Sequence, residues 1–138
     1  MAPNSPPLTI CLIDDDRIYQ FTAKRMIELV DPLQKVLIFS DGKEAMDFFS
    51  KQTQDRDPLP DVIFLDINMP VMNGWEFLDA YNSIKTTLDK QISIYMISSS
   101  VDEKDKIRSK GFNVKDFIEK PINKQMMRAI LQSSRSMV

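Results

Sequence analysis

Histidine is absent from this 138-residue sequence, and cysteine occurs once. Without histidine, Ser-His-Asp hydrolysis, imidazole acid–base catalysis and most transition-metal sites are excluded. Cys11 has no second cysteine with which to form an internal disulfide. Because it lies within an apolar run, it is predicted to be a small buried hydrophobe rather than a reactive thiol. Any chemistry must therefore depend on carboxylates, hydroxyls and lysine.

The sequence also has no long apolar run and no strong excess of one charge. No stretch approaches the roughly 20 apolar residues of a membrane-spanning helix. Residues 1–7 lack the basic start and apolar segment of a signal peptide and are predicted to be a flexible lead-in. The net charge is −2 with both signs interspersed, which does not favour a nucleic-acid-binding surface. We therefore expect a cytoplasmic protein with neither a membrane nor nucleic acid as its partner.

The composition is that of one soluble globular domain. The chain is 43% hydrophobic and 28% charged, and its length leaves room for a hydrophobic core. The domain is expected to cover residues 8–133, with a short C-terminal tail over residues 134–138.

Five short apolar runs predict five strands. Several are continuous rather than alternating, which is typical of strands covered on both faces in a parallel sheet. Segments with helical spacing of apolar residues separate them, so the chain is predicted to form a doubly wound α/β sheet. The runs are residues 8–13, 36–39, 62–65, 92–97 and 114–118. Two predicted helix stripes are Tyr19, Ala23, Met26, Ile27 and Val30, and, near the end of the chain, Ile122, Met126, Ala129 and Ile130.

Capping residues predict where helices begin. Asp41, Asn73 and Ser100 each precede a glutamate by three residues, the spacing of a capping box, and Asn123 can cap the last helix alone. The segment 101–110 has a thin apolar face but is still predicted to be helical. Residues 52–60 are polar with two prolines and are predicted to be a loop.

Acidic residues, hydroxyls and a lysine follow the predicted strands, where ligands bind in such sheets. Each has a simpler explanation when taken singly: Asp16, for example, is predicted mainly to stabilise a helix start. Together, however, three carboxylates, a hydroxyl and a lysine arrive at one edge of one sheet. They are Asp14, Asp15 and Asp16 after the first strand, Asp66 after the third, Ser98, Ser99 and Ser100 after the fourth, and Lys120 after the fifth.

Clustered carboxylates repel one another unless a proton or a cation joins them. An all-oxygen site suits a hard cation, and Mg²⁺ combines one or two carboxylates with waters and phosphate oxygens. The pattern therefore predicts a Mg²⁺ site that handles a phosphoryl group, with a lysine and a hydroxyl left to meet that group.

In order and spacing, these motifs resemble the receiver domains of bacterial two-component response regulators. The resemblance extends from Leu8 to about Ser133. It implies a flavodoxin-like (βα)5 fold with strand order 2-1-3-4-5, in a stand-alone protein similar to the chemotaxis regulators. The similar segments are Ile13-Asp14-Asp15-Asp16, Leu65-Asp66-Ile67-Asn68-Met69-Pro70 with Asn73-Gly74, Ile97-Ser98-Ser99, and Lys120-Pro121.

The resemblance also implies roles at the acidic end of the site. Asp66 matches the aspartate that accepts the phosphoryl group. Asp15 would be a direct Mg²⁺ ligand, Asp14 would act mainly through water, and Asn68 would offer its backbone carbonyl. Lys120 matches the lysine that pairs with the phosphoryl oxygens.

Two further matches concern the response to phosphorylation. Ser98 matches the switch hydroxyl, although threonine is commoner there, and Ser99 its small neighbour. Phe117 matches the switch aromatic that turns inward, but it lacks a tyrosine hydroxyl, and a simple core role is the alternative for it. The Lys120–Pro121 bond matches one that is often cis.

The implied function is a phosphorelay switch rather than an enzyme, with only self-phosphorylation and self-dephosphorylation. A histidine kinase or histidine phosphotransfer protein would be the donor. Because the chain ends soon after the last predicted helix, output is expected either through binding to another protein, which the sequence does not identify, or through passing the phosphoryl group on in a relay.

Two alternatives remain open. One is a phosphatase that forms a phosphoaspartate, as in the haloacid dehalogenase family. In that family the nucleophile follows the first strand in an Asp-x-Asp motif, whereas Asp66-Ile67-Asn68 follows the third and lacks the second acid. The other is an interaction module that is never phosphorylated and whose acidic cluster is structural.

Overall fold

The computed structural model describes residues 7–52, 59–88, 90–100 and 102–136, apart from the side chains of Gln52 and Ser136. Within these ranges the chain forms one five-stranded sheet in the order β2-β1-β3-β4-β5, which confirms the predicted topology. All neighbouring strands pair in parallel. The central strands β1, β3 and β4 are buried along their whole length, which explains their continuous apolar runs. The strands are β1 Thr9–Ile13, β2 Lys35–Phe39, β3 Val62–Asp66, β4 Ser93–Ser98 and β5 Asp116–Glu119.

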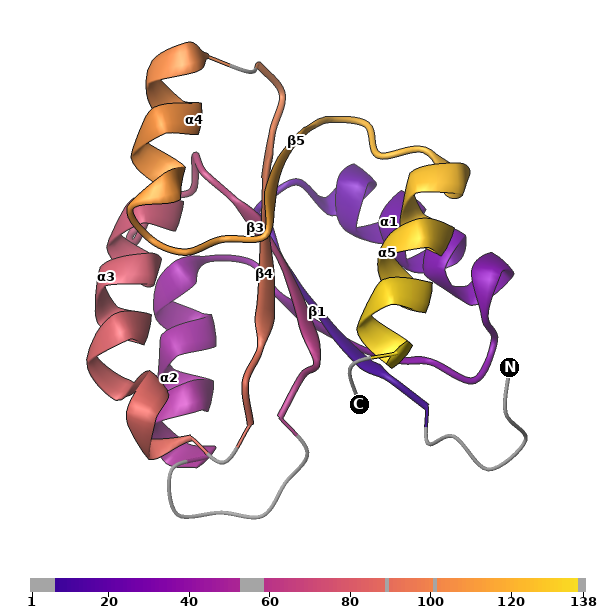
Figure 1. Ribbon diagram of the computed structural model, residues 1–138, viewed down its shortest axis with the longest axis horizontal. Coiled ribbons are helices and arrows are strands. Elements are labelled where there is room, and N and C mark those ends of the chain that lie inside the picture. The colour runs from indigo at the N-terminus through magenta and orange to yellow at the C-terminus, as the bar shows by residue number, and fades with distance from the viewer. Residues whose placement is uncertain (1–6, 53–58, 89, 101, 137–138) are drawn as a thin grey trace.

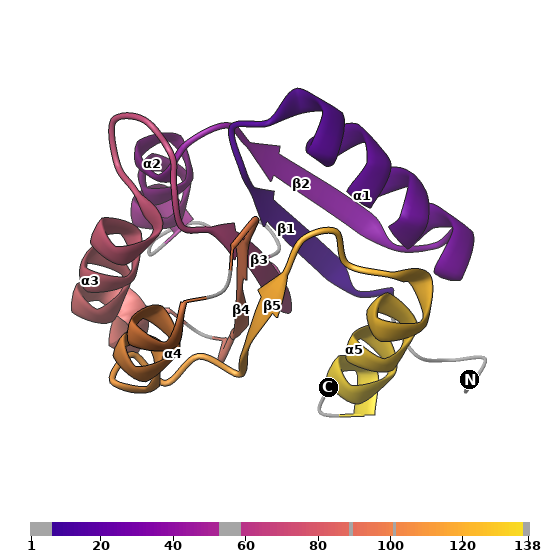
Figure 2. The ribbon, with the colours of Figure 1, turned by 90° about the horizontal axis from the view of Figure 1, so that it is seen from above.

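Helices cover both faces of the sheet (Figure 1). Helices α1 and α5 lie on one face, and α2, α3 and α4 lie on the other, as the view from above also shows (Figure 2). Each face has its own buried cluster. Phe49 and Phe77 belong to the cluster on the face covered by α2, α3 and α4, and Ile27 and Met127 belong to the cluster on the face covered by α1 and α5. The helices are α1 Arg17–Val30, α2 Gly42–Gln52, α3 Gly74–Ile84 continued by the 3-10 turn η1 Lys85–Thr87, α4 Glu103–Lys110 and α5 Lys124–Ser136.

Most of the predicted caps are confirmed. Asn73 and Glu76 form a capping box at the start of α3, and the side chain of Asn123 accepts a hydrogen bond from the first turn of α5. The prediction for Ser100 is wrong. Helix α4 begins at Glu103, so Asp102 is its cap and accepts from the backbone N–H of Lys104 at 3.0 Å.

The predicted apolar stripe of α5 is wrong at two positions. Met126 and Ala129 are exposed, whereas Met127 and Leu131 are buried with Ile130. The stripe therefore repeats from position 127 with the spacing of a helix face. The helix also continues to Ser136, so the boundary expected at residue 133 lies inside it.

Some predictions lie outside the described residues. These are the lead-in except Pro7, most of the 52–60 loop, Val101, and residues 137–138 of the expected tail. In the ranges that are described, no helix has the length and apolar character needed to cross a membrane.

Candidate functional site

The topology brings the acidic residues together at the carboxyl ends of β1 and β3. These strands are neighbours in parallel register, with Ile13 opposite Leu65, so the residues that follow them, Asp14 and Asp66, meet at the same sheet edge. One carboxylate oxygen from each of Asp14, Asp15 and Asp66 lies within 4.8 Å of the others. Asp14 and Asp66 are buried, at 1% and 6% exposure, whereas Asp15 is exposed. The cluster is therefore open to solvent on the Asp15 side.

Lys120 joins this cluster from the end of β5. Its ammonium nitrogen lies 2.7 Å from Oδ2 of Asp14 and 3.7 Å from Oδ1 of Asp66. The backbone N–H of Lys120 donates to the carbonyl of Ser98 at 2.7 Å, which holds this position beside β4. The Lys120–Pro121 bond is cis, as the family resemblance implies.

Burial makes the two inner carboxylates hard to ionise. Burial and the neighbouring charge of Asp14 raise the pKa of Asp66 to about 6, against the lowering influence of Lys120. Burial also raises the pKa of Asp14, although Lys120 and the backbone N–H of Asp16 oppose that change. A hard cation beside Asp15 would relieve the repulsion, so the donor set fits Mg²⁺ or a similar ion.

The loop after Asp66 is closely packed against the start of α3. The backbone N–H of Gly74 donates to the carbonyl of Ile67 at 2.8 Å. A Cβ atom on Gly74 would lie 2.6 Å from the carbonyl oxygen of Asp66, closer than real Cβ atoms come. Asn68 lies exposed in this loop, and its backbone hydrogen bond lowers the pKa of Asp66. Glycine at position 74 therefore lets the loop approach the helix.

The switch candidates lie on the strands β4 and β5 or directly after them. Ser98 is buried at the end of β4, where its hydroxyl donates to the carbonyl of Ser100 at 2.7 Å and accepts from the N–H of Ser100 at 3.3 Å. Ser99 is exposed. Phe117 is half-buried on β5 and lines a pocket of about 240 Å³ together with residues of α4, including Lys106 and Ser109.

One residue of the site was not anticipated as such. The sequence placed Tyr19 only in the apolar stripe of the first helix, yet its ring lies 4.5 Å from the ammonium nitrogen of Lys120. The signal was its position in the first turn of a helix that begins directly after Asp14, Asp15 and Asp16. A residue so close to the acidic end of β1 is within reach of the same site.

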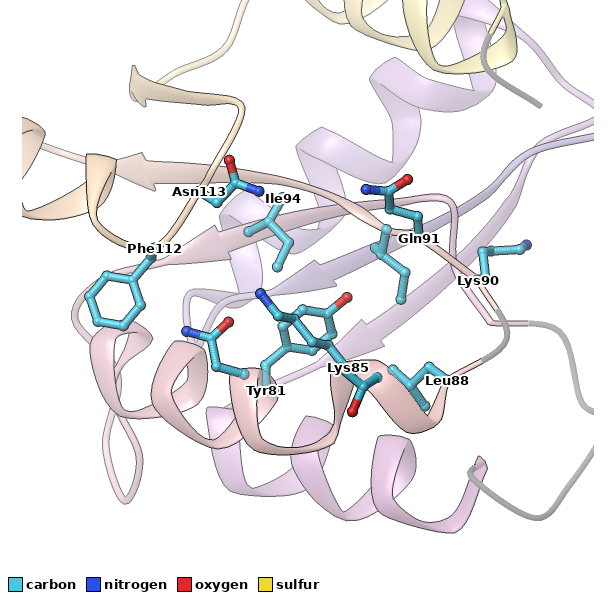
Figure 3. Close-up of a pocket in the computed structure, with 11 residues that line it drawn as sticks. Tyr81, Lys85, Leu88, Lys90, Gln91, Ile94, Phe112 and Asn113 are labelled. Carbon is cyan, nitrogen blue, oxygen red and sulfur yellow. The ribbon is translucent and has the colours of Figure 1, made fainter.

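A separate pocket of about 460 Å³ lies near the amino end of β4 (Figure 3). Tyr81 and Lys85 approach it from α3 and η1, and Phe112 and Asn113 from the loop before β5. It shares no lining residue with the acidic cluster, and therefore belongs to a different region of the molecule.

The sequence matches a known family over most of its length. The family model described as the response regulator receiver domain matches residues 10–132. Response regulator Rcp1 of Synechocystis is 27% identical over 135 residues, which cover 96% of this chain and 90% of Rcp1. Hybrid signal transduction histidine kinase I of Dictyostelium discoideum is 29% identical over 98 residues, and there the match spans 71% of this chain but 6% of the kinase.

Solved structures agree with this fold. A two-component response regulator from Cytophaga hutchinsonii superposes with a TM-score of 0.83 at 23% identity, covering 94% of this chain and 98% of that one. The Mn²⁺-bound form of Rcp1 superposes with a TM-score of 0.68 at 26% identity, covering 94% and 93% of the two chains. Both matches extend over nearly the whole of this chain and of the solved one.

Proposed function

The chain belongs to the response regulator receiver domain family, and from that premise we propose that Asp66 accepts the phosphoryl group of a two-component signalling pathway. The observation that carries the proposal is the position of Asp66: buried, clustered with Asp14 and Asp15, and 3.7 Å from the ammonium of Lys120. A carboxylate beside a lysine, among acids that can hold a cation, is suited to attack a phosphorus centre, because the lysine and the cation balance the negative charge of the phosphoryl group.

The proposed step is a phosphoryl transfer from a histidine kinase or a histidine phosphotransfer protein. An Oδ atom of Asp66 attacks the phosphorus of the donor's phosphohistidine, and the bond between phosphorus and the imidazole nitrogen breaks. The electron pair of that bond stays on the nitrogen, which takes up a proton from solvent. The product is an acyl phosphate on Asp66, with Lys120 paired to its oxygens.

The metal belongs to the same proposal. Asp15 and Asp66 would hold Mg²⁺ directly, with the backbone carbonyl of Asn68, while Asp14 would act through water. The exposure of Asp15 and the pairing of Asp14 with Lys120 support this division. When bound, the cation neutralises charge that develops on the transferred phosphoryl oxygens. The Mn²⁺-bound form of the related Rcp1 is consistent with a divalent cation here.

Ser98 and Phe117 are proposed to report the phosphorylated state. The phosphoryl oxygens offer the Ser98 hydroxyl a charged acceptor in place of the Ser100 carbonyl. Movement of that hydroxyl would let Phe117 turn inward from its half-buried position against α4. The surface formed by α4, β5 and α5 would change with it, and output would pass to another protein through that surface.

Both alternatives make different predictions for the same protein. A phosphoaspartate-forming phosphatase would turn over a small phosphoester repeatedly, and the receiver family match counts against it. An unphosphorylated interaction module would keep its acidic cluster only for structure. The raised pKa values of Asp14 and Asp66 make a purely structural role costly for the fold.

Intact-mass measurement after incubation with Mg²⁺ and acetyl phosphate tests the proposal. We expect one phosphoryl adduct on the wild type, none on Asp66→Asn, and none when a chelator is present. Asp16→Asn is the matched control, because Asp16 caps α1 and asparagine caps equally well. A folded wild type that takes no adduct while hydrolysing the donor continuously would favour the phosphatase. A folded wild type that takes no adduct and leaves the donor intact would favour the interaction module.

A further inference from the structure

We propose that Tyr19 is a positioning residue for Lys120, with its ring face keeping the lysine ammonium beside Asp66 during phosphoryl transfer. The inference rests on the proposed function and assigns a role to a residue that the sequence placed in the core. It concerns the ring of Tyr19 rather than its hydroxyl.

The ammonium of Lys120 lies among three groups. Its nitrogen is 2.7 Å from Asp14, 3.7 Å from Asp66 and 4.5 Å from the centre of the Tyr19 ring. The Lys120 side chain is 16% exposed and Tyr19 is 9% exposed, so the contact between ammonium and ring is largely shielded from water. A cation over an aromatic face is attracted by the ring quadrupole, more strongly when water is excluded.

The ring differs from the two carboxylates because it carries no charge that the reaction changes. Asp66 becomes an acyl phosphate, and Asp14 lies in the cluster where a cation would offset its charge. The attraction of both groups for the ammonium therefore changes as the reaction proceeds. The ring keeps its attraction throughout, and it does not compete with the phosphoryl oxygens for the charge of Lys120. A lysine with a long flexible stem therefore keeps one contact that the reaction does not change.

The start of α1 places the ring for this purpose. The Asp16 side chain accepts hydrogen bonds from the backbone N–H groups of Ile18 and Tyr19, at 2.9 and 3.2 Å. The cap that begins the helix therefore also orients the residue that meets Lys120. The same short segment thus supplies two acids to the cluster and an aromatic face to its lysine.

The Tyr19 hydroxyl contributes nothing to this contact. Within the described parts of the chain it is buried and has no hydrogen-bond partner. Burial and the nearby charges of Asp14 and Asp66 raise its pKa, so it stays protonated. Removing it should therefore leave the site working, whereas removing the ring should not.

The test compares Tyr19→Leu with Tyr19→Phe at saturating Mg²⁺. The rate constant for phosphorylation by acetyl phosphate is followed by intact mass. We expect a fall of roughly fivefold to thirtyfold for Tyr19→Leu, the effect of losing a desolvated cation–π contact, and a change of less than about twofold for Tyr19→Phe. Tyr95→Leu is the matched control, because Tyr95 is also 9% exposed and belongs to the same buried cluster but packs against Phe64.

A second measurement reports the contact without any reaction. The ε-methylene resonances of Lys120, assigned with Lys120→Arg, should be shifted upfield by the ring current in the wild type and in Tyr19→Phe. They should move to ordinary positions in Tyr19→Leu. Tyr19→Met, which fills similar space, replaces Tyr19→Leu if the latter does not fold.

The outcomes separate the two proposals. If the wild type takes up no phosphoryl group, the proposed function is wrong, and the positioning role of Tyr19 that rests on it is wrong as well. If the wild type is phosphorylated and the folded Tyr19→Leu protein reacts at the same rate, the positioning role alone is wrong. An equal loss in Tyr19→Phe, or in Tyr95→Leu, would also overturn it, because the first would implicate the hydroxyl and the second general packing.

Discussion

The ammonium nitrogen of Lys120 lies 2.7 Å from Oδ2 of Asp14, closer than its 3.7 Å separation from Asp66. Without a bound cation, the lysine therefore neutralises the most deeply buried carboxylate of the cluster. A lysine and a divalent cation in one acidic cluster share the same negative charge and repel each other. The repulsion between Lys120 and the cation is therefore expected to lower the affinity of the site for the metal.

Replacing Lys120 with alanine is expected to tighten Mg²⁺ binding by about tenfold, because a repelling positive charge is removed from the cluster. Calorimetric titration with Mg²⁺ measures the change. Lys43→Ala is the control, since Lys43 pairs with Asp47 on the exposed surface of α2. Unchanged or weaker binding in Lys120→Ala would show that the lysine arranges the acids for the metal rather than opposing it.

In the absence of divalent cations, Asp66→Asn is expected to be more stable than the wild type at neutral pH. The pKa of Asp66 is raised to about 6, so the folded state holds its proton more tightly than the unfolded state does. As pH rises from about 4 to about 6, the unfolded chain loses this proton first, and wild-type stability falls. Above about pH 6 the free energy of unfolding of Asp66→Asn should exceed that of the wild type by roughly 1–3 kcal/mol. This difference should vanish near pH 4.

Urea unfolding in chelator at several pH values tests this expectation. Adding Mg²⁺ should reduce the stability difference between Asp66→Asn and the wild type, because the cation binds the folded wild type more tightly than it binds the folded variant. A difference between the two proteins that stays constant from pH 4 to pH 8 would contradict the raised pKa.

Gly74→Ala is expected to destabilise the protein by about 1–3 kcal/mol, because its Cβ would press on the backbone of Asp66 and Ile67. Urea unfolding measures the cost. Gly111→Ala is a matched control, since its Cβ would meet the nearest atom at an ordinary 3.5 Å and its φ is −70°. We expect that control to be neutral or slightly stabilising. Equal effects at both positions would argue against the close approach at Gly74.

Cys11 should not react with a thiol reagent in the folded protein. It is 0% exposed at the centre of β1, and burial raises the pKa of its thiol. Labelling with an aromatic disulfide reagent is expected to be negligible in native buffer and complete in urea. Rapid native labelling would mean that β1 opens far more readily than a central strand should.

The doubly wound fold class and the acidic residues of the cluster were predictable from local patterns, whereas the strand order came from the family resemblance. Continuous apolar runs identify buried parallel strands, and the carboxyl ends of such strands meet at one edge. Asp14 and Asp66 had to converge once β1 and β3 were neighbours. The same reasoning located Lys120, because β5 ends at the same edge.

The details that were missed depend on side-chain direction or on a choice between neighbours. Ser100 and Asp102 both suit a helix cap, and only the start of α4 decides between them. Met126 and Met127 are adjacent, so the sequence alone left the buried face of α5 ambiguous by one position. The contact of Tyr19 with Lys120 joins two helix–strand units far apart in the chain. The local sequence places Tyr19 near the acidic end of β1, but it does not show that the ring meets Lys120.

The hydroxyl of Ser98 can donate one hydrogen bond, and the carbonyl of Ser100 accepts it. Under the proposed switch, a phosphoryl oxygen accepts this hydrogen bond only when it replaces the carbonyl. Activation is therefore an exchange of hydrogen-bond acceptors. Such an exchange differs by about 1–2 kcal/mol, which changes the ratio of the two states by roughly fivefold to thirtyfold. A ratio of this size would leave a minor fraction of the phosphorylated protein in the resting arrangement. The acceptor that competes with the phosphoryl oxygen is the backbone carbonyl of Ser100. A substitution of the Ser100 side chain would therefore not remove it.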